Sequence, residues 1–127
     1  DAYAALTKPL ILPLHRFSKD DLSALNQQSQ KLDFGIDLTP GVFDIKDHYC
    51  QIPSESTAAY AIACAIKGNA KSILLVGFDG YEKGDFRQNE MVDFFIALER
   101  HGQNKHITSL TPTTYPIREG SIYAPKI

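Results

Sequence analysis

The residues best suited to bind a ligand gather in the segment LLVGFDGYEKGDFRQNE, residues 74 to 90, where an apolar run meets glycines, aromatics and charges. Asp79 ends that run, and a carboxylate there can accept hydrogen bonds from the hydroxyls of a ribose or sugar. Tyr81 can stack on a ring. Arg87 falls in the first turn of an expected helix, where its charge opposes the helix dipole, which indicates a carboxylate partner or an anionic ligand. In the structural alternative, Asp79 anchors a neighbouring loop and Tyr81 covers a sheet edge.

Three glycines in the same segment, Gly77, Gly80 and Gly84, form the pattern GxxGxxxG. This pattern differs from the GxGxxG of dinucleotide-binding folds and from the GxxxxGK[ST] of P-loops, so neither assignment is supported. The glycines either provide turns and close packing or let the backbone approach a ligand.

A second group of polar residues, Ser54, Ser56 and Thr57, stands at the start of another expected helix. The free backbone N–H groups of a helix start attract phosphates and carboxylates, and the hydroxyls add further hydrogen bonds. The same serines also suit ordinary capping, in which a side-chain oxygen accepts a backbone N–H. Both interpretations remain open.

Patterns that would define a reaction or a metal site are not found in the sequence. The histidines have no metal-binding spacing such as HExxH, and no GxSxG motif or serine or cysteine with a local base marks a nucleophile. We therefore expect a binding site with no metal and no cofactor, and leave open whether the chain is an enzyme. The histidines are His15, His48, His101 and His106.

The elements that must position these residues alternate between helix and strand after residue 54. Ala59, Ile62 and Ile66 follow helical spacing and predict a helix capped by Ser54 or Ser56, with Gly68 in the left-handed conformation at its end.

The segment Ser72–Phe78 has no polar alternation, which favours a strand in the middle of a sheet covered by helices on both faces. Asp85 opens the next helix, with Gln88 at the capping-box position. Met91 and three further apolar residues line the inner face of that helix, and a strand over residues 107–110 follows. The further inner-face residues are Phe94, Phe95 and Leu98.

Shorter elements are expected before and after this region. Ser18 and Asp21 form a capping box that opens a helix extending to about Gln28. Alternating or short apolar runs predict strands over residues 10–14, 32–38 and 42–45, and the tail ends in the short apolar run 122–124.

The helix–strand alternation predicts an α/β fold, a Rossmann-like three-layer sandwich with a mostly parallel central sheet. Ligands of such sheets bind beyond the carboxyl ends of the strands, where helices begin, and the segment 74–90 lies at one of those ends. The length suits one domain over residues 1–127, and the start at Asp1 suggests the C-terminal fragment of a longer protein.

Composition and charge exclude two classes of partner, nucleic acids and membranes. A net charge of -2 with no cluster of Lys and Arg predicts no nucleic-acid surface, and no apolar stretch is long enough to cross a membrane. Cys50 and Cys64 do not form a CxxC pair, so we expect reduced thiols in a cytoplasmic protein, with a disulfide as the alternative. The N-terminus also lacks the features of a secretory signal.

The segment Ile52–Phe95 resembles the C-terminal domain of a group of bacterial aldolase-like proteins, and Thr111–Tyr115 is similar to the segment that follows in that domain. Those proteins carry an N-terminal TIM barrel like that of hydroxymethylglutaryl-CoA lyase and 4-hydroxy-2-oxovalerate aldolase, and often occur with surface-polysaccharide genes. The resemblance implies an accessory domain whose partner is the barrel. It also implies that this chain lacks the metal-binding and lyase residues of the barrel.

A more distant resemblance is to bacterial sialyltransferases, which share a helix beginning with Ser or Thr and a buried strand ending in Gly-(Phe/Ile)-Asp. In those enzymes this region helps to hold the cytidine nucleotide. Their glycine-rich N-terminal strand–loop is absent here, and no residue matches their catalytic histidine. The matching positions are Ser56, Thr57, Gly77, Phe78, Asp79 and Tyr81.

Three hypotheses follow. The leading one is an accessory domain that binds a small anionic or sugar-like ligand, or packs against its barrel, without completing catalysis. The second is a CMP-sugar-binding part of a glycosyltransferase-type enzyme, and the third is a structural module that forms a homo-oligomer. The residues expected to bind are Ser54, Ser56, Thr57, Asp79, Tyr81 and Arg87.

Overall fold

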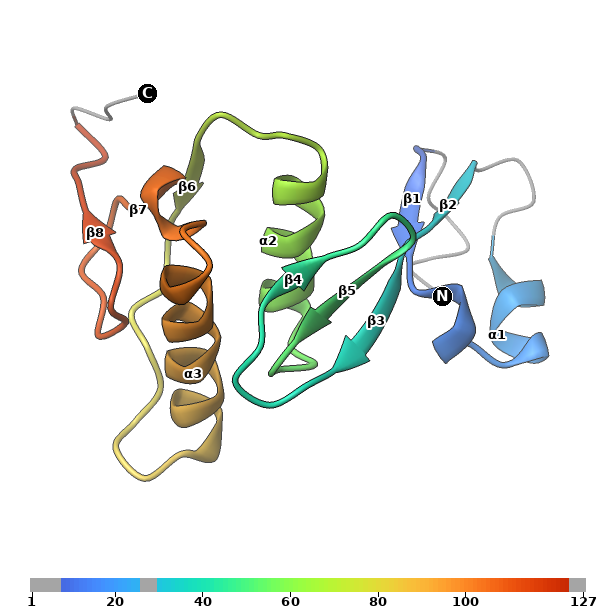
Figure 1. Cartoon of the computed structure of the whole chain (residues 1–127), viewed down its shortest axis with the longest axis horizontal. Coiled ribbons are helices and arrows are strands. Elements are labelled where there is room, and N and C mark those ends of the chain that lie inside the picture. Colours follow the sequence, from blue (N-terminus) through green and yellow to red (C-terminus); the bar gives the residue numbers. More distant parts are fainter. Residues whose placement is uncertain (1–7, 26–29, 124–127) are drawn as a thin grey trace.

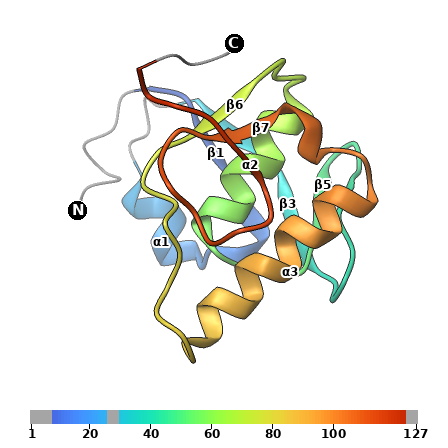
Figure 2. The ribbon, with the colours of Figure 1, turned by 90° about the vertical axis from the view of Figure 1, so that its left-hand side faces the viewer.

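The computed structural model describes residues 8–25 and 30–123, which form a mixed α/β protein. Two helices dominate it: α2 (Thr57–Lys67) and α3 (Phe86–Arg100). Both views of the ribbon show them next to each other (Figures 1 and 2), and Figure 1 shows β1 and β2 toward one end of the molecule and the C-terminal strands toward the other. The α/β class predicted from the sequence is confirmed.

The N-terminal strands are joined through Phe34. Its N–H donates to the Leu12 carbonyl at 3.1 Å, and the next N–H, that of Gly35, donates to the His48 carbonyl at 2.8 Å. Successive N–H groups of an extended chain point to opposite sides, so β1 and β5 flank one extended segment made of β2 and β3. The pairs β1–β2 and β3–β5 are parallel, and β4 runs antiparallel to β5. The bounds are β1 (Leu10–Leu12), β2 (Lys31–Asp33), β3 (Gly35–Leu38), β4 (Asp44–Ile45) and β5 (Tyr49–Ile52).

The C-terminal strands form a parallel sheet in the order β6–β7–β8. The expected unit of strand, helix and parallel strand is confirmed as β6 (Ile73–Leu75), α3 and β7 (Ile107–Ser109). The central position expected for β6 is wrong: it lies at the end of its sheet, and Val76, just after it, is 61% exposed. The reason is that β5 already pairs with β3 on one edge and β4 on the other. The third strand is β8 (Arg118–Glu119).

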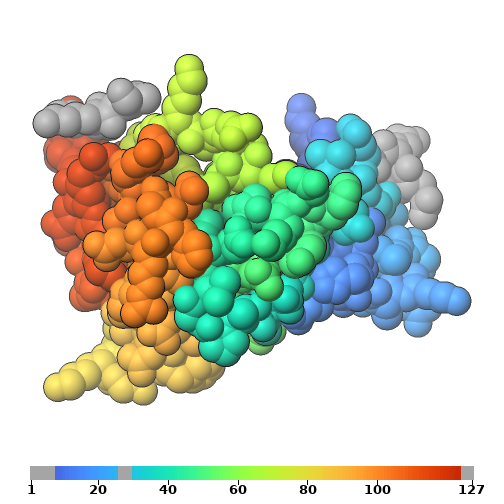
Figure 3. All heavy atoms as spheres, viewed as in Figure 1, coloured from blue at the N-terminus to red at the C-terminus, as the bar shows by residue number. Residues whose placement is uncertain are grey.

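One apolar core joins the two halves. Phe43, just before β4, meets Phe94 of α3 edge to face, with ring centroids 5.9 Å apart. Figure 3 shows the segment around β3–β5 between α3 and the N-terminal part of the chain that holds β1. Ala59, Ile62 and Ala63 form the buried face of α2, as the helical spacing predicts. The largest fully buried apolar side chains are Phe43, Phe94, Phe95, Ile52, Leu98 and Ile107.

Several local expectations are confirmed and others are wrong. The capping box of Ser18 and Asp21 is present, but the helix that it opens, α1 (Lys19–Ala24), ends before residues 26–29, which lie outside the described chain. The left-handed conformation expected at Gly68 is wrong, because Gly68 has φ -77°. The next residue, Asn69, adopts the left-handed conformation, with φ 59°. Strands β5 and β8 were not expected, and the apolar run at Ile122 forms no strand over its described residues.

Candidate functional site

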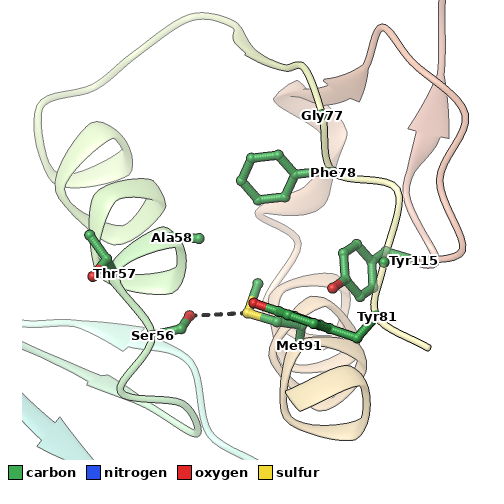
Figure 4. Close-up of a pocket in the computed structure, with 9 residues that line it drawn as sticks. Ser56, Thr57, Ala58, Gly77, Phe78, Tyr81, Met91 and Tyr115 are labelled. Atoms are coloured by element: carbon green, nitrogen blue, oxygen red, sulfur yellow. Dashed lines mark hydrogen bonds between the residues drawn. The ribbon is translucent and has the colours of Figure 1, made fainter. Parts of the chain in front are cut away.

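A cleft of about 420 Å³ lies between the start of α2, the loop from β6 to α3, and the segment after β7. Figure 4 shows the rings of Phe78, Tyr81 and Tyr115 on one side of this cleft, and Ser56 and Ala58 of α2 facing them from the other. The loop that follows β6 therefore meets the start of α2, which follows β5 in the other sheet. The lining residues are Ser56, Thr57, Ala58, Gly77, Phe78, Gly80, Tyr81, Met91 and Tyr115.

The three hydroxyl residues expected at the α2 start have different roles. Ser54 is 1% exposed, and its hydroxyl accepts the Ser56 N–H at 3.2 Å, which stabilises the turn before α2. Ser54 does not line the cleft. Ser56 caps the helix by accepting the Ala59 N–H at 3.1 Å, and its hydroxyl donates to the Met91 sulfur at 3.1 Å. Thr57 lines the cleft with an exposed side chain.

The first turn of α2 also keeps two backbone donors available. Within residues 8–25 and 30–123, no acceptor engages the N–H of Thr57 or of Ala58. These are positions at which an α-helix has no acceptor of its own. An acceptor atom of a ligand in the cleft can take up these hydrogen bonds.

Tyr81 is held in place by a charged pair beneath its ring. The Arg87 guanidinium lies 4.3 Å from the Tyr81 ring centroid. Two hydrogen bonds of 3.1 and 2.7 Å fix the same guanidinium to the Asp85 carboxylate, which caps α3. The carboxylate partner expected for Arg87 is therefore Asp85. Arg87 does not line the cleft but supports the ring that does.

The loop from β6 to α3 is tied to the segment after β7. The Asp79 carbonyl accepts two hydrogen bonds from Thr114, one from the backbone N–H at 3.0 Å and one from the side-chain hydroxyl at 3.1 Å. The capping-box role expected for Gln88 is wrong, because its side chain accepts the Tyr81 N–H at 2.8 Å and donates to the Thr114 hydroxyl at 2.9 Å. Asp79 thus contributes its backbone to the loop, and its exposed side chain does not line the cleft.

Tyr115 and Met91 are lining residues that sequence reasoning did not propose for the site. Met91 was expected in the α3 core, where it is indeed buried. Tyr115 follows the predicted strand over residues 107–110, so the rule that ligands bind beyond carboxyl ends of parallel strands could have pointed to it. Burial, and then the neighbouring Tyr81 and Asp85, raise the pKa of the Tyr115 phenol.

Among the residues that the structure describes, those that line the cleft are polar, aromatic or apolar, and none is charged. Cys50 and Cys64 are free thiols, and burial raises the pKa of both, that of Cys50 to about 12. Neither thiol lines the cleft. Among the described residues, no three His, Cys, Asp or Glu side chains gather as metal ligands.

The Asp85–Arg87 pair predicts a measurable dependence of stability on pH. The hydrogen bond from Arg87, followed by the backbone hydrogen bond, lowers the pKa of Asp85. A lowered carboxyl pKa contributes stability above the unfolded value of about 3.9, and this contribution is lost as the pH falls through the folded value. We expect Asp85→Asn to show a smaller loss of stability between neutral pH and acid than the wild type, measured by urea unfolding at several pH values.

The matched variant for this experiment is Arg87→Leu, which keeps the carboxylate but removes the largest cause of the shift. Its loss of stability with acid should lie between those of the wild type and Asp85→Asn. Wild-type behaviour in both variants would show that the pair does not stabilise the fold.

Comparisons of this chain with protein families, with curated proteins and with solved structures found no match. No helix in the described residues is long and apolar enough to span a membrane. Function must therefore be inferred from the chemistry of the cleft.

Proposed function

We propose that this chain is an accessory domain that binds a small, ring-bearing polar molecule in the cleft at the α2 start. The observation that carries the proposal is the gathering of three aromatic rings, Phe78, Tyr81 and Tyr115, around one cleft (Figure 4). Aromatic side chains stack on flat rings and offer polar groups at their edges. The volume of about 420 Å³ falls in the range of roughly 300–1,000 Å³ that small-molecule sites occupy.

The opposite wall supports a polar or acidic group on the same ligand. The N–H groups of Thr57 and Ala58 stand at the positive end of the α2 dipole, which favours an anionic or carbonyl oxygen. A ligand that suits both walls has a ring at one end and an acceptor group at the other, as sugar acids and nucleotides have.

Binding without catalysis fits the groups that line the cleft. The Ser56 hydroxyl donates to the Met91 sulfur and has no base beside it. A hydroxyl nucleophile needs an adjacent base, and the described lining of the cleft contains no His, Asp, Glu or Lys side chain. The domain therefore holds its ligand for chemistry performed elsewhere.

The resemblance of Ile52–Phe95 to the C-terminal domain of bacterial aldolase-like proteins supports a context for this binding. In that context the chain is a Rossmann-like three-layer domain beside an N-terminal TIM barrel, in a cytoplasmic aldolase or lyase linked to surface-polysaccharide metabolism. The parallel unit β6–α3–β7 is compatible with such a domain.

A second candidate function, binding of a CMP-sugar in a glycosyltransferase-type enzyme, is favoured by one specific observation. Of the six positions that resemble the nucleotide-holding region of sialyltransferases, five line the cleft. Asp79 is the sixth, and it holds the loop through its backbone. The five are Ser56, Thr57, Gly77, Phe78 and Tyr81.

The binding proposal is tested by titrating the protein with CMP, a CMP-sugar, sugar phosphates and 2-oxo acids, followed by NMR and thermal unfolding. Stacking on an aromatic side chain contributes about 1–3 kcal/mol, so Tyr81→Ala should weaken the binding of a ring-bearing probe by about 5- to 150-fold. Tyr123→Ala is the control, because Tyr123 is 91% exposed and does not line the cleft.

The probe that binds distinguishes the proposed functions from one another. Binding of CMP would favour the glycosyltransferase-type function, and binding of a sugar phosphate or 2-oxo acid would favour the accessory domain of an aldolase. If no probe shifts the signals of cleft residues, the binding proposal is wrong. A dimer by light scattering would then support the third hypothesis, a structural module.

A further inference from the structure

The hydroxyl of Tyr115 stands out among the polar groups of the cleft. The side chain is deeply buried, with Tyr115 6% exposed, and its ring packs on Phe95 with centroids 5.2 Å apart. Figure 4 shows the hydroxyl directed into the cleft, toward Tyr81 and Met91. In the part of the chain that the structure describes, the hydroxyl has no hydrogen-bond partner, whereas the backbone N–H of Tyr115 donates to Thr113 at 3.1 Å.

Tyr60 shows how a half-buried phenol is satisfied elsewhere in the same protein. Its hydroxyl donates to the Phe34 carbonyl at 2.6 Å. The Tyr115 oxygen has no such partner, but it is not fully buried, because every fully buried side-chain oxygen or nitrogen in the described part of the chain has a hydrogen bond. A phenylalanine at position 115 would make the same ring contact with Phe95. Packing therefore explains the ring of Tyr115 but not its oxygen.

The surroundings of Tyr115 determine what its hydroxyl can recognise. Burial and the nearby Asp85 carboxylate disfavour a negative charge on the phenol, so the group stays protonated and can donate a hydrogen bond. The same burial disfavours a negative charge on a ligand at this point. The charges of Asp85 and Arg87 are paired with each other at 2.7 Å, so neither of them selects the charge of the ligand.

We propose that the Tyr115 hydroxyl donates a hydrogen bond to an uncharged oxygen, a ring carbonyl or hydroxyl, on the ligand. The ring end of the ligand is then neutral, and any acidic group lies at the opposite wall, beside the Thr57 and Ala58 N–H groups. This inference rests on the proposed binding function and adds the orientation and the chemical class of the ligand. Tyr115 becomes the residue that determines specificity at the ring end.

The test uses two fragments of nearly the same shape, benzamide and benzoate, which differ in charge. Each is titrated into protein labelled with ¹³C-tyrosine, and the ring signals of Tyr81 and Tyr115 are followed by NMR. We expect benzamide to bind more tightly than benzoate at the Tyr115 end. Loss of one hydrogen bond should make Tyr115→Phe bind benzamide about fivefold more weakly and leave benzoate unchanged.

A stability measurement separates recognition from a structural role. Tyr115→Phe should keep the wild-type urea midpoint, because no hydrogen bond to the described protein is lost. Tyr60→Phe is the matched control and should lower the midpoint, since it loses the bond to Phe34. A clear loss of stability in Tyr115→Phe would assign the hydroxyl to the fold and overturn the inference.

The remaining outcomes distinguish this inference from the binding proposal on which it rests. Equal affinity of wild type and Tyr115→Phe for benzamide, or tighter binding of benzoate at the ring end, overturns the inference and leaves a ligand-binding cleft. If neither fragment and none of CMP, the CMP-sugar, the sugar phosphates or the 2-oxo acids shifts the signals of cleft residues, both proposals fail together.

Discussion

Replacing Gly80 with alanine should lower the free energy of unfolding by about 2–4 kcal/mol, combining the cost of a left-handed backbone with that of steric overlap. Gly80 has φ +114°, which side chains rarely tolerate, and an added Cβ would overlap the Thr114 hydroxyl. It would also come within 3.0 Å of the Gln88 side-chain oxygen. Those two groups tie the β6–α3 loop to the segment that carries Tyr115, so the substitution affects the cleft directly.

Gly84→Ala is the matched control for this prediction. Gly84 has φ +92° in the same loop, but nothing lies within 4 Å of its added Cβ. It should therefore show only the conformational cost, about 1–2 kcal/mol. Urea unfolding gives both values, and amide exchange of Tyr81 shows whether its bond to Gln88 persists. Equal losses and equal exchange in the two variants would refute the role of Gly80 as a close-contact position.

The parts of the fold that were predicted correctly are those determined by nearby residues. Ser56 and Asp85 cap helices whose first turns lie beside them in sequence, and the spacing of apolar residues then fixes the buried faces. The position of β6 in its sheet could not be predicted, because it depends on β4 pairing with β5 through a turn. β5 itself was missed, since Gln51 and Pro53 make its short sequence look like a loop.

The residues of the candidate site show the same difference between features set by nearby residues and features set by distant contacts. The conflict of Arg87 with the helix dipole predicted either a carboxylate partner or an anionic ligand, and the structure gives it Asp85, two residues away. Tyr115 was missed because its approach depends on Gln88, which bridges to Thr114 across 26 residues of sequence. No spacing rule contains such a contact. Ser56, Thr57 and Tyr81 were therefore expected at the site and line the cleft, whereas Tyr115 was missed.

Phe95→Ala should lower the free energy of unfolding by about 3–5 kcal/mol, the usual cost of removing a buried phenylalanine ring. Phe95 is fully buried and packs between Phe94, at 5.4 Å between ring centroids, and Tyr115, at 5.2 Å. Because small domains have only about 5–15 kcal/mol of stability, the variant should unfold at much lower urea concentration. Phe94→Ala is the control, with a comparable loss because its ring is equally buried.

The two phenylalanines should differ in their effect on the cleft, which the milder leucine variants can show because they remain folded. Phe95→Leu removes the ring that supports Tyr115, so the Tyr115 ring signals should shift and benzamide should bind more weakly. Phe94→Leu leaves that support in place, since the Phe94 ring meets Phe43 on its other side. Equal effects of both variants on the cleft would mean that stability alone controls it. A selective effect of Phe95→Leu would show that the core of α3 fixes the aromatic wall through one ring contact.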